Sequence, residues 1–294
     1  MSQDDPKQFI PPTRFARSSK DDAFTWHWDL SDKSLTDGVA INLPPSYVVP
    51  IIFVPGIMGS NLMVTRNVGG LRAGAPSWLV NGTVGASKKW LFRQAETRQL
   101  RLNPNTTDVY PGGDVPDYVQ SIGDGKAIRA NRYWGEVIAG YGGFLRWLEE
   151  TLNVQSSANI KQRVEMWSSL NNTDFSKRWG ALSSFVKQTD AQVKHCAQMR
   201  FPVYACGYNW LQDNMQSAER LKRRIEEVIK ANNFGPSICR QVILVTHSMG
   251  GLVARACSEL KNMSPNIAGV VHGVMPALGS ATAYKRVRAG TEGL

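Results

Sequence analysis

One serine stands where a hydrophobic run passes directly into a helical pattern. The run Val242 to Val245 is followed by T-H-S-M-G-G at 246–251, and an amphipathic stretch then continues to about Asn262. This order predicts a strand, a sharp turn and a helix, with Ser248 exposed at the turn in a strained backbone conformation. A serine in that position is suited to attack a carbonyl carbon, so we predict that Ser248 is a catalytic nucleophile.

The residues around Ser248 must be small, because the strand and the helix pass each other closely. Gly250, two positions after the serine, meets this requirement. The usual pattern is G-x-S-x-G, and here Thr246 replaces the first glycine, so the turn must find room for a larger side chain. The alternative is a tight strand-to-helix turn that carries no chemistry, as in many α/β folds.

A second segment is suited to binding the oxyanion that acyl transfer creates. The buried run 47–54 ends abruptly in P-G-I-M-G at 55–59, where proline and glycine bend the chain. We predict that the oxyanion hole is formed by the backbone N–H groups of Met249 and Ile57, with Gly56 and Met58 lining the site. A plain turn is the alternative for this cluster.

The remaining members of a catalytic triad are not evident after Ser248. The acidic residues there are Glu259 and Glu292, and the histidine is His272. In serine hydrolases built on an α/β sheet, the triad residues follow one another along the chain as serine, acid and histidine. Glu259 lies about three turns along the helix and should point away, and His272 precedes any plausible acidic partner.

The histidines near the turn are therefore assigned supporting positions. We interpret His272 as lining the site at the end of a strand rather than as the base, although a base remains the alternative. His247 also lines the site, and its side chain is expected to face away from the oxyanion hole. We expect the acid and the base to follow Leu294, so that the chain is the N-terminal portion of a larger hydrolase.

Strands and helices alternate through the second half of the chain. Strands are predicted at about 47–54, 201–206, 241–245 and 267–271, and helices at about 134–152, 174–196, 214–233 and 250–262. Such alternation predicts an α/β fold with a mostly parallel central sheet flanked by helices. In the helix after Asp213 or Asn214, we place Arg224 on the outer face.

The other parts of the chain have less regular patterns. Residues 1–46 are polar and proline-rich, which predicts an extended arm, and 47–294 form the domain. No helical period persists in 63–132, so we predict a long functional loop inserted after the oxyanion strand. Whether it covers the site as a lid stays open.

Composition narrows the class of protein. The chain has 294 residues, 42% hydrophobic and 20% charged, as in ordinary globular proteins. The net charge of +10 favours an anionic partner. No aromatic-basic motif accompanies this charge, so the charge is the only feature that suggests the hypothesis of nucleic-acid binding. The four cysteines are scattered and predict buried thiols, and neither metal nor cofactor is expected. No apolar run is long enough to span a membrane, and no cleavable signal peptide is evident.

With these segments identified, the chain resembles α/β-hydrolase lipases of the group spanning lecithin:cholesterol acyltransferase and the GPI-inositol deacylases. Within that group it is most similar to bacterial type VI secretion lipase effectors. The segments that carry the resemblance are I-I-F-V-P-G-I-M-G-S-N-L at 51–62, Y-W-G-E-V at 133–137, C-G-Y-N-W at 206–210, T-H-S-M-G-G at 246–251 and H-G-V-M-P-A-L-G at 272–279. Asn209 departs from the aspartate of the acyltransferase group. The matches cover roughly 48–62 and 133–290.

The resemblance implies an α/β-hydrolase fold whose C-terminal strands we expect to be missing from this chain. It also implies that the protein hydrolyses lipid carboxylic esters, as a phospholipase acting peripherally at a membrane surface. Effectors of this type are made in the cytoplasm, exported by a type VI system as antibacterial toxins, and bound by an immunity protein and a component of the secretion machine. The alternative is a catalytically incomplete module of this fold that binds lipid or protein.

Overall fold

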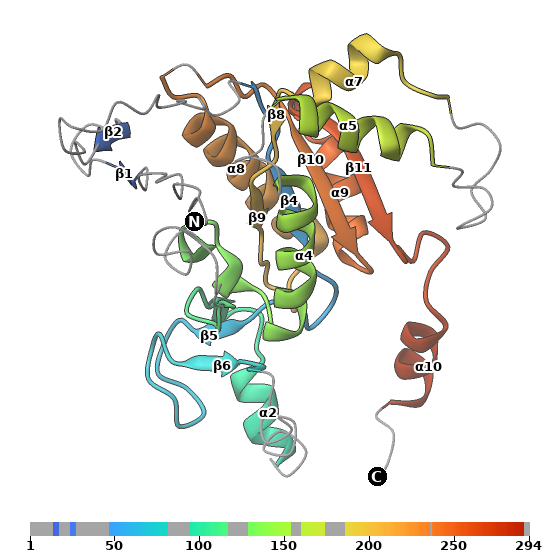
Figure 1. Cartoon of the computed structure of the whole chain (residues 1–294). Helices are drawn as coiled ribbons and strands as arrows, with labels where there is room; N and C mark the ends of the chain where they lie inside the picture. Colours follow the sequence, from blue (N-terminus) through green and yellow to red (C-terminus); the bar gives the residue numbers. More distant parts are fainter. Residues whose placement is uncertain are drawn as a thin grey trace, which may run out of the picture.

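Among the residues that the structure describes, four parallel strands form the central sheet, in the order β11-β10-β4-β9 (Figure 1). They are β4 (Ile51–Val54), β9 (Val203–Ala205), β10 (Val242–His247) and β11 (Ile267–Gly273). This computed structural model describes residues 14–17, 24–27, 47–81, 94–116, 129–153, 160–173, 186–235 and 237–290. All neighbouring pairs of this sheet run parallel, which confirms the predicted α/β architecture.

Helices cover both faces of the sheet. The helices α8 (Asn214–Asn232) and α9 (Gly250–Glu259) pack on one face, and α4 (Gly142–Asn153) packs on the other. Strand β4 is buried on both sides because helices cover both faces of the sheet. Its successive side chains alternate between the two faces. Ile52 joins the core under α8 and α9, whereas Phe53 joins the core under α4. Each such buried side chain contributes about 1.5–3 kcal/mol of transfer free energy.

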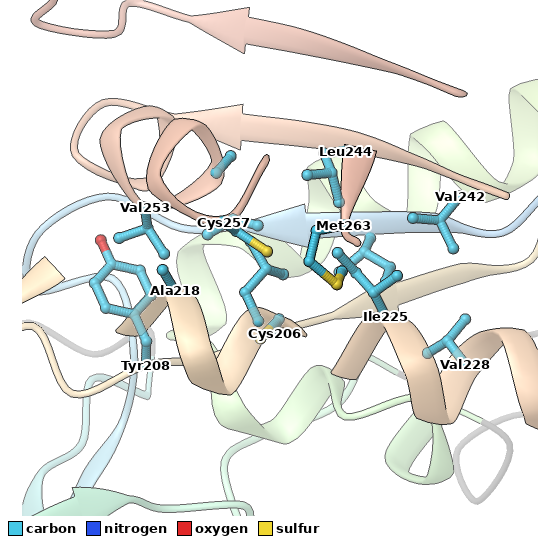
Figure 2. Packing of buried hydrophobic residues seen from close by; sticks show 14 of the residues in the cluster. Cys206, Tyr208, Ala218, Ile225, Val228, Val242, Leu244, Val253, Cys257 and Met263 are labelled. Atoms are coloured by element: carbon cyan, nitrogen blue, oxygen red, sulfur yellow. The ribbon is translucent and has the colours of Figure 1, made fainter. Parts of the chain in front are cut away.

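The core under α8 and α9 holds the segment around Ser248 in place. Figure 2 shows side chains from both helices and the sheet meeting there: Ala218, Ile225, Leu244, Val253 and Cys257. Cys206, Cys239 and Cys257 are buried free thiols, as predicted, whereas Cys196 is half-buried. Burial raises the pKa of the Cys206 thiol to about 11.

Helix α8 begins as predicted, but one residue on it was misplaced. Asp213 is the N-cap and accepts a hydrogen bond from the Met215 N–H at 2.6 Å. The prediction that Arg224 faces outward is wrong, since its side chain is buried. The reason is an ion pair with Glu136, whose carboxylate lies 2.9 Å from the guanidinium. A periodicity argument could not find this distant partner.

The helix predicted at 134–152 is shorter than expected. Its first part forms two 3-10 turns, η1 (Trp134–Glu136) and η2 (Ala139–Tyr141), before α4 begins at Gly142. Val137 breaks the helix because it forms an antiparallel bridge with Ser60. Tertiary pairing therefore overrides the apolar spacing in this segment.

The helix predicted at 174–196 is also wrong in part. Helix α7 (Asp190–Cys196) begins only after Thr189, which forms a capping box with Gln192. Residues 186–189 are not helical, and 174–185 lie outside the described residues. Another helix, α5 (Ile160–Asn171), was not predicted.

The insertion at 63–132 contains regular structure that the prediction of a loop missed. Its described residues contribute to an antiparallel sheet in the order β6-β5-β7 and to one helix. These elements are β5 (Leu62–Val64), β6 (Pro76–Trp78), α2 (Ala95–Arg101) and β7 (Thr107–Val109). The strands are only three residues long, too short to show a period in the sequence. In Figure 1 this small sheet lies beyond the end of β4.

The remaining described elements are short or peripheral. They are β1 (Arg14–Arg17), β2 (Phe24–His27), β3 (Tyr47–Val48), β8 (Met199–Arg200), η3 (Ser264–Asn266) and α10 (Ala281–Ala289). Helix α10 was not predicted, is exposed throughout and stands apart from the sheet in Figure 1. None of the helices in the described ranges has the length and hydropathy that crossing a membrane requires.

Candidate functional site

The backbone at Ser248 is strained. Its φ angle is 50°, in the left-handed region that residues with a side chain rarely adopt. Such a conformation costs about 1–3 kcal/mol and persists only where surrounding contacts hold it. Here the Ser248 N–H donates to the Gly273 carbonyl at 2.8 Å, and the Ser248 carbonyl accepts from the Gly251 N–H at 3.0 Å. The predicted strand, turn and helix are confirmed, with Ser248 at the carboxyl end of β10, where α/β sheets bind ligands.

Two glycines let α9 begin directly against its neighbours. A Cβ at Gly250 would lie 2.4 Å from the Pro55 carbonyl oxygen and 2.5 Å from that of Val54. These are backbone atoms at the end of β4, so they cannot move without shifting the sheet. A Cβ at Gly251 would instead meet the Met275 side chain, at 2.6 Å from Cγ and 2.8 Å from Cβ. The close passage of strand and helix therefore requires glycine at 250, as the sequence indicated.

The Thr246 side chain packs against the neighbouring strand, β11. This side chain is buried, and Oγ1 lies 2.8 Å from Nδ1 of His272, the residue opposite it on β11. The His272 side chain is exposed at the carboxyl end of that strand. This contact explains how a threonine replaces the usual glycine, and it occupies one nitrogen of His272. A lining position for His272 stays a prediction.

The segment 55–59 lies against the turn at Ser248. A Cβ at Gly56 would be 3.1 Å from the Cβ of Ser248. The Gly59 N–H donates to the Gly56 carbonyl at 3.0 Å, which closes a tight turn, and Met58 has a φ of 60°. The Ile57 side chain is 56% exposed at this turn.

Two backbone amides beside the serine are available to a ligand. Within the described ranges, the N–H groups of Ile57 and Met249 donate to no protein atom. One follows the bend after β4 and the other follows Ser248, as the predicted oxyanion hole requires. The two segments that contain these N–H groups lie together. The role of the two N–H groups as oxyanion donors remains a prediction.

A tyrosine hydroxyl links the two segments. The Gly56 N–H donates to Tyr141 Oη at 3.3 Å, and the same oxygen lies 2.9 Å from Nδ1 of His247. The His247 side chain lies against this segment, since Nδ1 would be only 2.9 Å from a Cβ at Gly56, and its predicted orientation away from the oxyanion hole stays a prediction. Burial raises the pKa of Tyr141, although the Gly56 N–H partly opposes this. Tyr141 lies within the segment 134–152 that was predicted as a helix, and no sequence pattern indicated this contact.

Further contacts fix the segment 55–59 from the other side. The Trp78 indole N–H donates to the Met58 carbonyl at 3.0 Å, and the Tyr208 hydroxyl donates to the Pro55 carbonyl at 3.0 Å. Burial raises the pKa of Tyr208, which keeps its hydroxyl protonated as a donor. Trp78 belongs to the insertion and Tyr208 to the segment C-G-Y-N-W, so residues far apart in sequence hold this turn. No local pattern identifies either contact.

A buried ion pair supports the loops behind these contacts. One Glu136 oxygen lies 2.9 Å from the Arg224 guanidinium, and the other accepts from the Gly207 N–H at 2.9 Å. Arg224 also donates to the Ala205 carbonyl at 2.8 Å and lies over the Tyr133 ring at 3.3 Å from its centroid. The network therefore joins α8, the end of β9 and the Y-W-G-E-V segment.

In the described part of the chain, no pair of histidine and acidic side chains is hydrogen-bonded to Ser248. The Ser248 hydroxyl makes no hydrogen bond to a histidine in that part of the chain. Glu259 is exposed at the last position of α9, away from the serine at its start. Over the same residues, no group of three histidine, cysteine or acidic side chains is placed to hold a metal ion.

Known proteins resemble this chain in sequence and fold. A family described as the PGAP1-like alpha/beta domain matches residues 195–285. The chain is also similar to one in the crystal structure of the Tle4–Tli4 complex, with 28% identity and a TM-score of 0.66. That similarity covers 84% of this chain and 49% of the other, so this chain spans about half of the matched length. No curated protein matches the chain.

These similarities agree with the geometry of the site. The PGAP1-like match includes both β10 and the turn at Ser248, and the structural match extends over most of the chain. The α/β-hydrolase fold is therefore confirmed, as is the resemblance to the group that includes GPI-inositol deacylases and type VI lipase effectors.

Proposed function

We propose that this chain, which has the α/β-hydrolase fold, acts as a serine hydrolase on lipid carboxylic esters. The observation that carries the proposal is the strained backbone of Ser248, at φ 50°, in contact with the segment whose Ile57 N–H donates to no protein atom among the described residues. In this proposal residues 47–294 form the hydrolase domain with 63–132 inserted, and 1–46 form an N-terminal arm.

The proposed reaction follows from the positions of these groups. Ser248 Oγ attacks the ester carbonyl carbon, and the carbonyl oxygen becomes an oxyanion that accepts hydrogen bonds from the N–H groups of Ile57 and Met249. Collapse of this intermediate breaks the ester bond, releases the alcohol, whose oxygen takes up the proton lost by the Ser248 hydroxyl, and leaves an acyl group on Ser248. Water then hydrolyses that acyl group and restores the serine. Each oxyanion donor of this kind is worth about 10²–10³ in rate.

Two features favour a lipid rather than a small soluble ester. The apolar side chains of Ile57 and Met58 are 56% and 45% exposed beside Ser248, where an acyl chain would enter. The net charge of +10 favours an anionic phospholipid surface, to which the protein would bind peripherally. Similarity to Tle4, a type VI lipase effector, supports the same class of substrate.

The biological setting is part of the proposal. The similar structure is a complex of Tle4 with Tli4, so we infer that this protein is also exported by a type VI system, acts as an antibacterial toxin and is bound by an immunity protein. Toxicity to a target bacterium should then require Ser248. Equal toxicity of the Ser248→Ala variant would separate any toxic effect from hydrolysis.

A second candidate function is a binding module that lacks catalysis. It is favoured by one observation, that the Ser248 hydroxyl has no histidine partner among the described residues. A serine without a base is a weak nucleophile. Binding of the full-length protein to anionic liposomes without any release of fatty acid would support this candidate.

Phospholipid hydrolysis by the full-length protein tests the main proposal. We expect fatty acid release from mixed liposomes, with the rate falling about 10³-fold or more in Ser248→Ala. The matched control is Ser258→Ala, which removes a hydroxyl from the same helix region. Ser258 Oγ donates to the Arg255 carbonyl on α9, so its loss should leave the rate within about twofold.

A further inference from the structure

The Tyr141 hydroxyl occupies the junction between the segment 55–59 and the turn at Ser248. It lies 3.3 Å from the Gly56 nitrogen and 2.9 Å from His247 Nδ1, although these residues are 85 and 106 positions away in sequence. The ring itself is held by Phe53, with centroids 4.8 Å apart, and by an edge contact with the His247 ring at 5.7 Å. One oxygen atom thus bridges two segments that must keep a fixed separation.

The direction of these hydrogen bonds follows from their donors. The Gly56 N–H donates, so Tyr141 Oη accepts there and can donate its own proton to Nδ1 of a neutral His247. In that arrangement His247 carries its ring proton on Nε2. Burial raises the pKa of Tyr141, so the phenol keeps the proton that the second bond needs.

The hydrogen bond between Gly56 and Tyr141 determines which backbone N–H remains available to an oxyanion. Because the Gly56 N–H is used by Tyr141, it is not available to an oxyanion, whereas the Ile57 N–H has no protein acceptor among the described residues. Ile57 is held from both sides, by Tyr141 through Gly56 and by the Trp78 indole through the Met58 carbonyl. Two fixed neighbours leave the intervening peptide little freedom to turn.

We propose that Tyr141, together with His247, is a positioning residue that clamps the oxyanion segment onto the nucleophile turn and so orients the Ile57 N–H. The inference rests on the proposed function for its catalytic consequence, but the clamp itself is a property of the folded chain. Tyr141 touches no reacting atom in this account. It acts through Gly56 on one side and through the residue before Ser248 on the other.

Removing only the hydroxyl tests the clamp. In full-length Tyr141→Phe the ring still packs on Phe53, and we expect kcat for a short-chain ester to fall about 10- to 100-fold with KM within about twofold, because misplacing a catalytic group lowers kcat. The matched control is Tyr204→Phe, which removes a hydroxyl that accepts from Asn232 far from the turn. Equal effects of both variants would overturn the proposal.

Two variants of His247 test whether a substitute acceptor restores the hydrogen bond with Tyr141. The Asn side chain of His247→Asn can place an acceptor near the position of Nδ1, whereas His247→Leu cannot. We expect kcat to be partly restored in the asparagine variant relative to the leucine variant. If the two variants have the same kcat and KM, the hydrogen bond to Tyr141 has no positioning role.

A measurement without turnover separates this inference from the proposed function. Amide hydrogen exchange of the peptide containing 51–59 should speed up at least about tenfold in Tyr141→Phe, while peptides from α8 and β10 keep their rates. Unchanged exchange at 51–59, or a uniform rise across the chain, would overturn the clamp. If exchange responds as expected but wild type and Ser248→Ala hydrolyse nothing, the clamp stands and the proposed function fails.

Discussion

Gly56 and Ser248 are in direct contact: a Cβ placed on Gly56 would lie 3.1 Å from the Cβ of the serine. The same Cβ would be 2.9 Å from Nδ1 of His247. The bend after β4 and the turn after β10 therefore form one compact unit at the carboxyl edge of the sheet. This closeness makes the site sensitive to single methyl groups.

Gly56→Ala should lower ester hydrolysis strongly. The added methyl pushes the segment away from the turn, and misplacing one oxyanion donor costs about 10²-fold or more in kcat. The matched control is Gly143→Ala on α4, where a Cβ meets nothing within 4 Å. Steady-state kinetics of both variants check this, and equal activity of Gly56→Ala and wild type would contradict it.

Gly250→Ala and Gly251→Ala should differ in stability although they are adjacent. At 250 the methyl meets the backbone oxygens of Pro55 and Val54 at the end of a central strand, whereas at 251 it meets side-chain atoms of Met275 on the segment after β11. We expect Gly250→Ala to lower the free energy of unfolding by about 1–3 kcal/mol or more, and Gly251→Ala by less. Urea unfolding measures both. A smaller loss for Gly250→Ala than for Gly251→Ala would be inconsistent with this packing.

Sequence reasoning succeeded where a local pattern carries the structure. The run Val242 to Val245, the glycine at 250 and the cap at Asp213 depend on neighbours in the chain, and all three are present as expected. The contact of Tyr141 was missed and the position of Arg224 was predicted wrongly, because both depend on partners 85 or more residues away, Gly56 and Glu136. Periodicity can indicate which face is apolar, but it cannot identify a single distant acceptor.

The buried pair between Glu136 and Arg224 should matter more for folding than its exposed neighbours. Arg224→Met removes the partner at 2.9 Å and leaves the buried Glu136 carboxylate with Arg220 at 3.4 Å, so we expect the free energy of unfolding to fall by about 1–3 kcal/mol. The matched control is Arg223→Met, one position earlier on the exposed face of α8, where we expect a change within about 0.5 kcal/mol. Chemical unfolding measures the free energy of unfolding of both variants. Similar decreases in the two would refute the special role of Arg224.

Stability should fall in alkaline solution because of the buried thiols. Burial raises the pKa of Cys206 and Cys239 to about 11 and that of Cys257 to about 12, from an ordinary value of 9.0. The unfolded thiols lose protons first, so stability is fully present below about pH 9 and is lost as pH rises toward the folded values. Urea unfolding at pH 8 and pH 10.5 should show a shallower loss for Cys206→Ala than for wild type. An identical pH dependence would contradict this account.

The most direct test of the central claim is covalent labelling of Ser248 in the full-length protein. A fluorophosphonate probe reacts with an activated serine next to an oxyanion hole, and peptide mass spectrometry identifies the labelled residue. We predict a label on Ser248 in wild type and none in a folded Ser248→Ala variant. Equal labelling of the two proteins, or a label on another serine alone, would contradict the claim that Ser248 is the nucleophile.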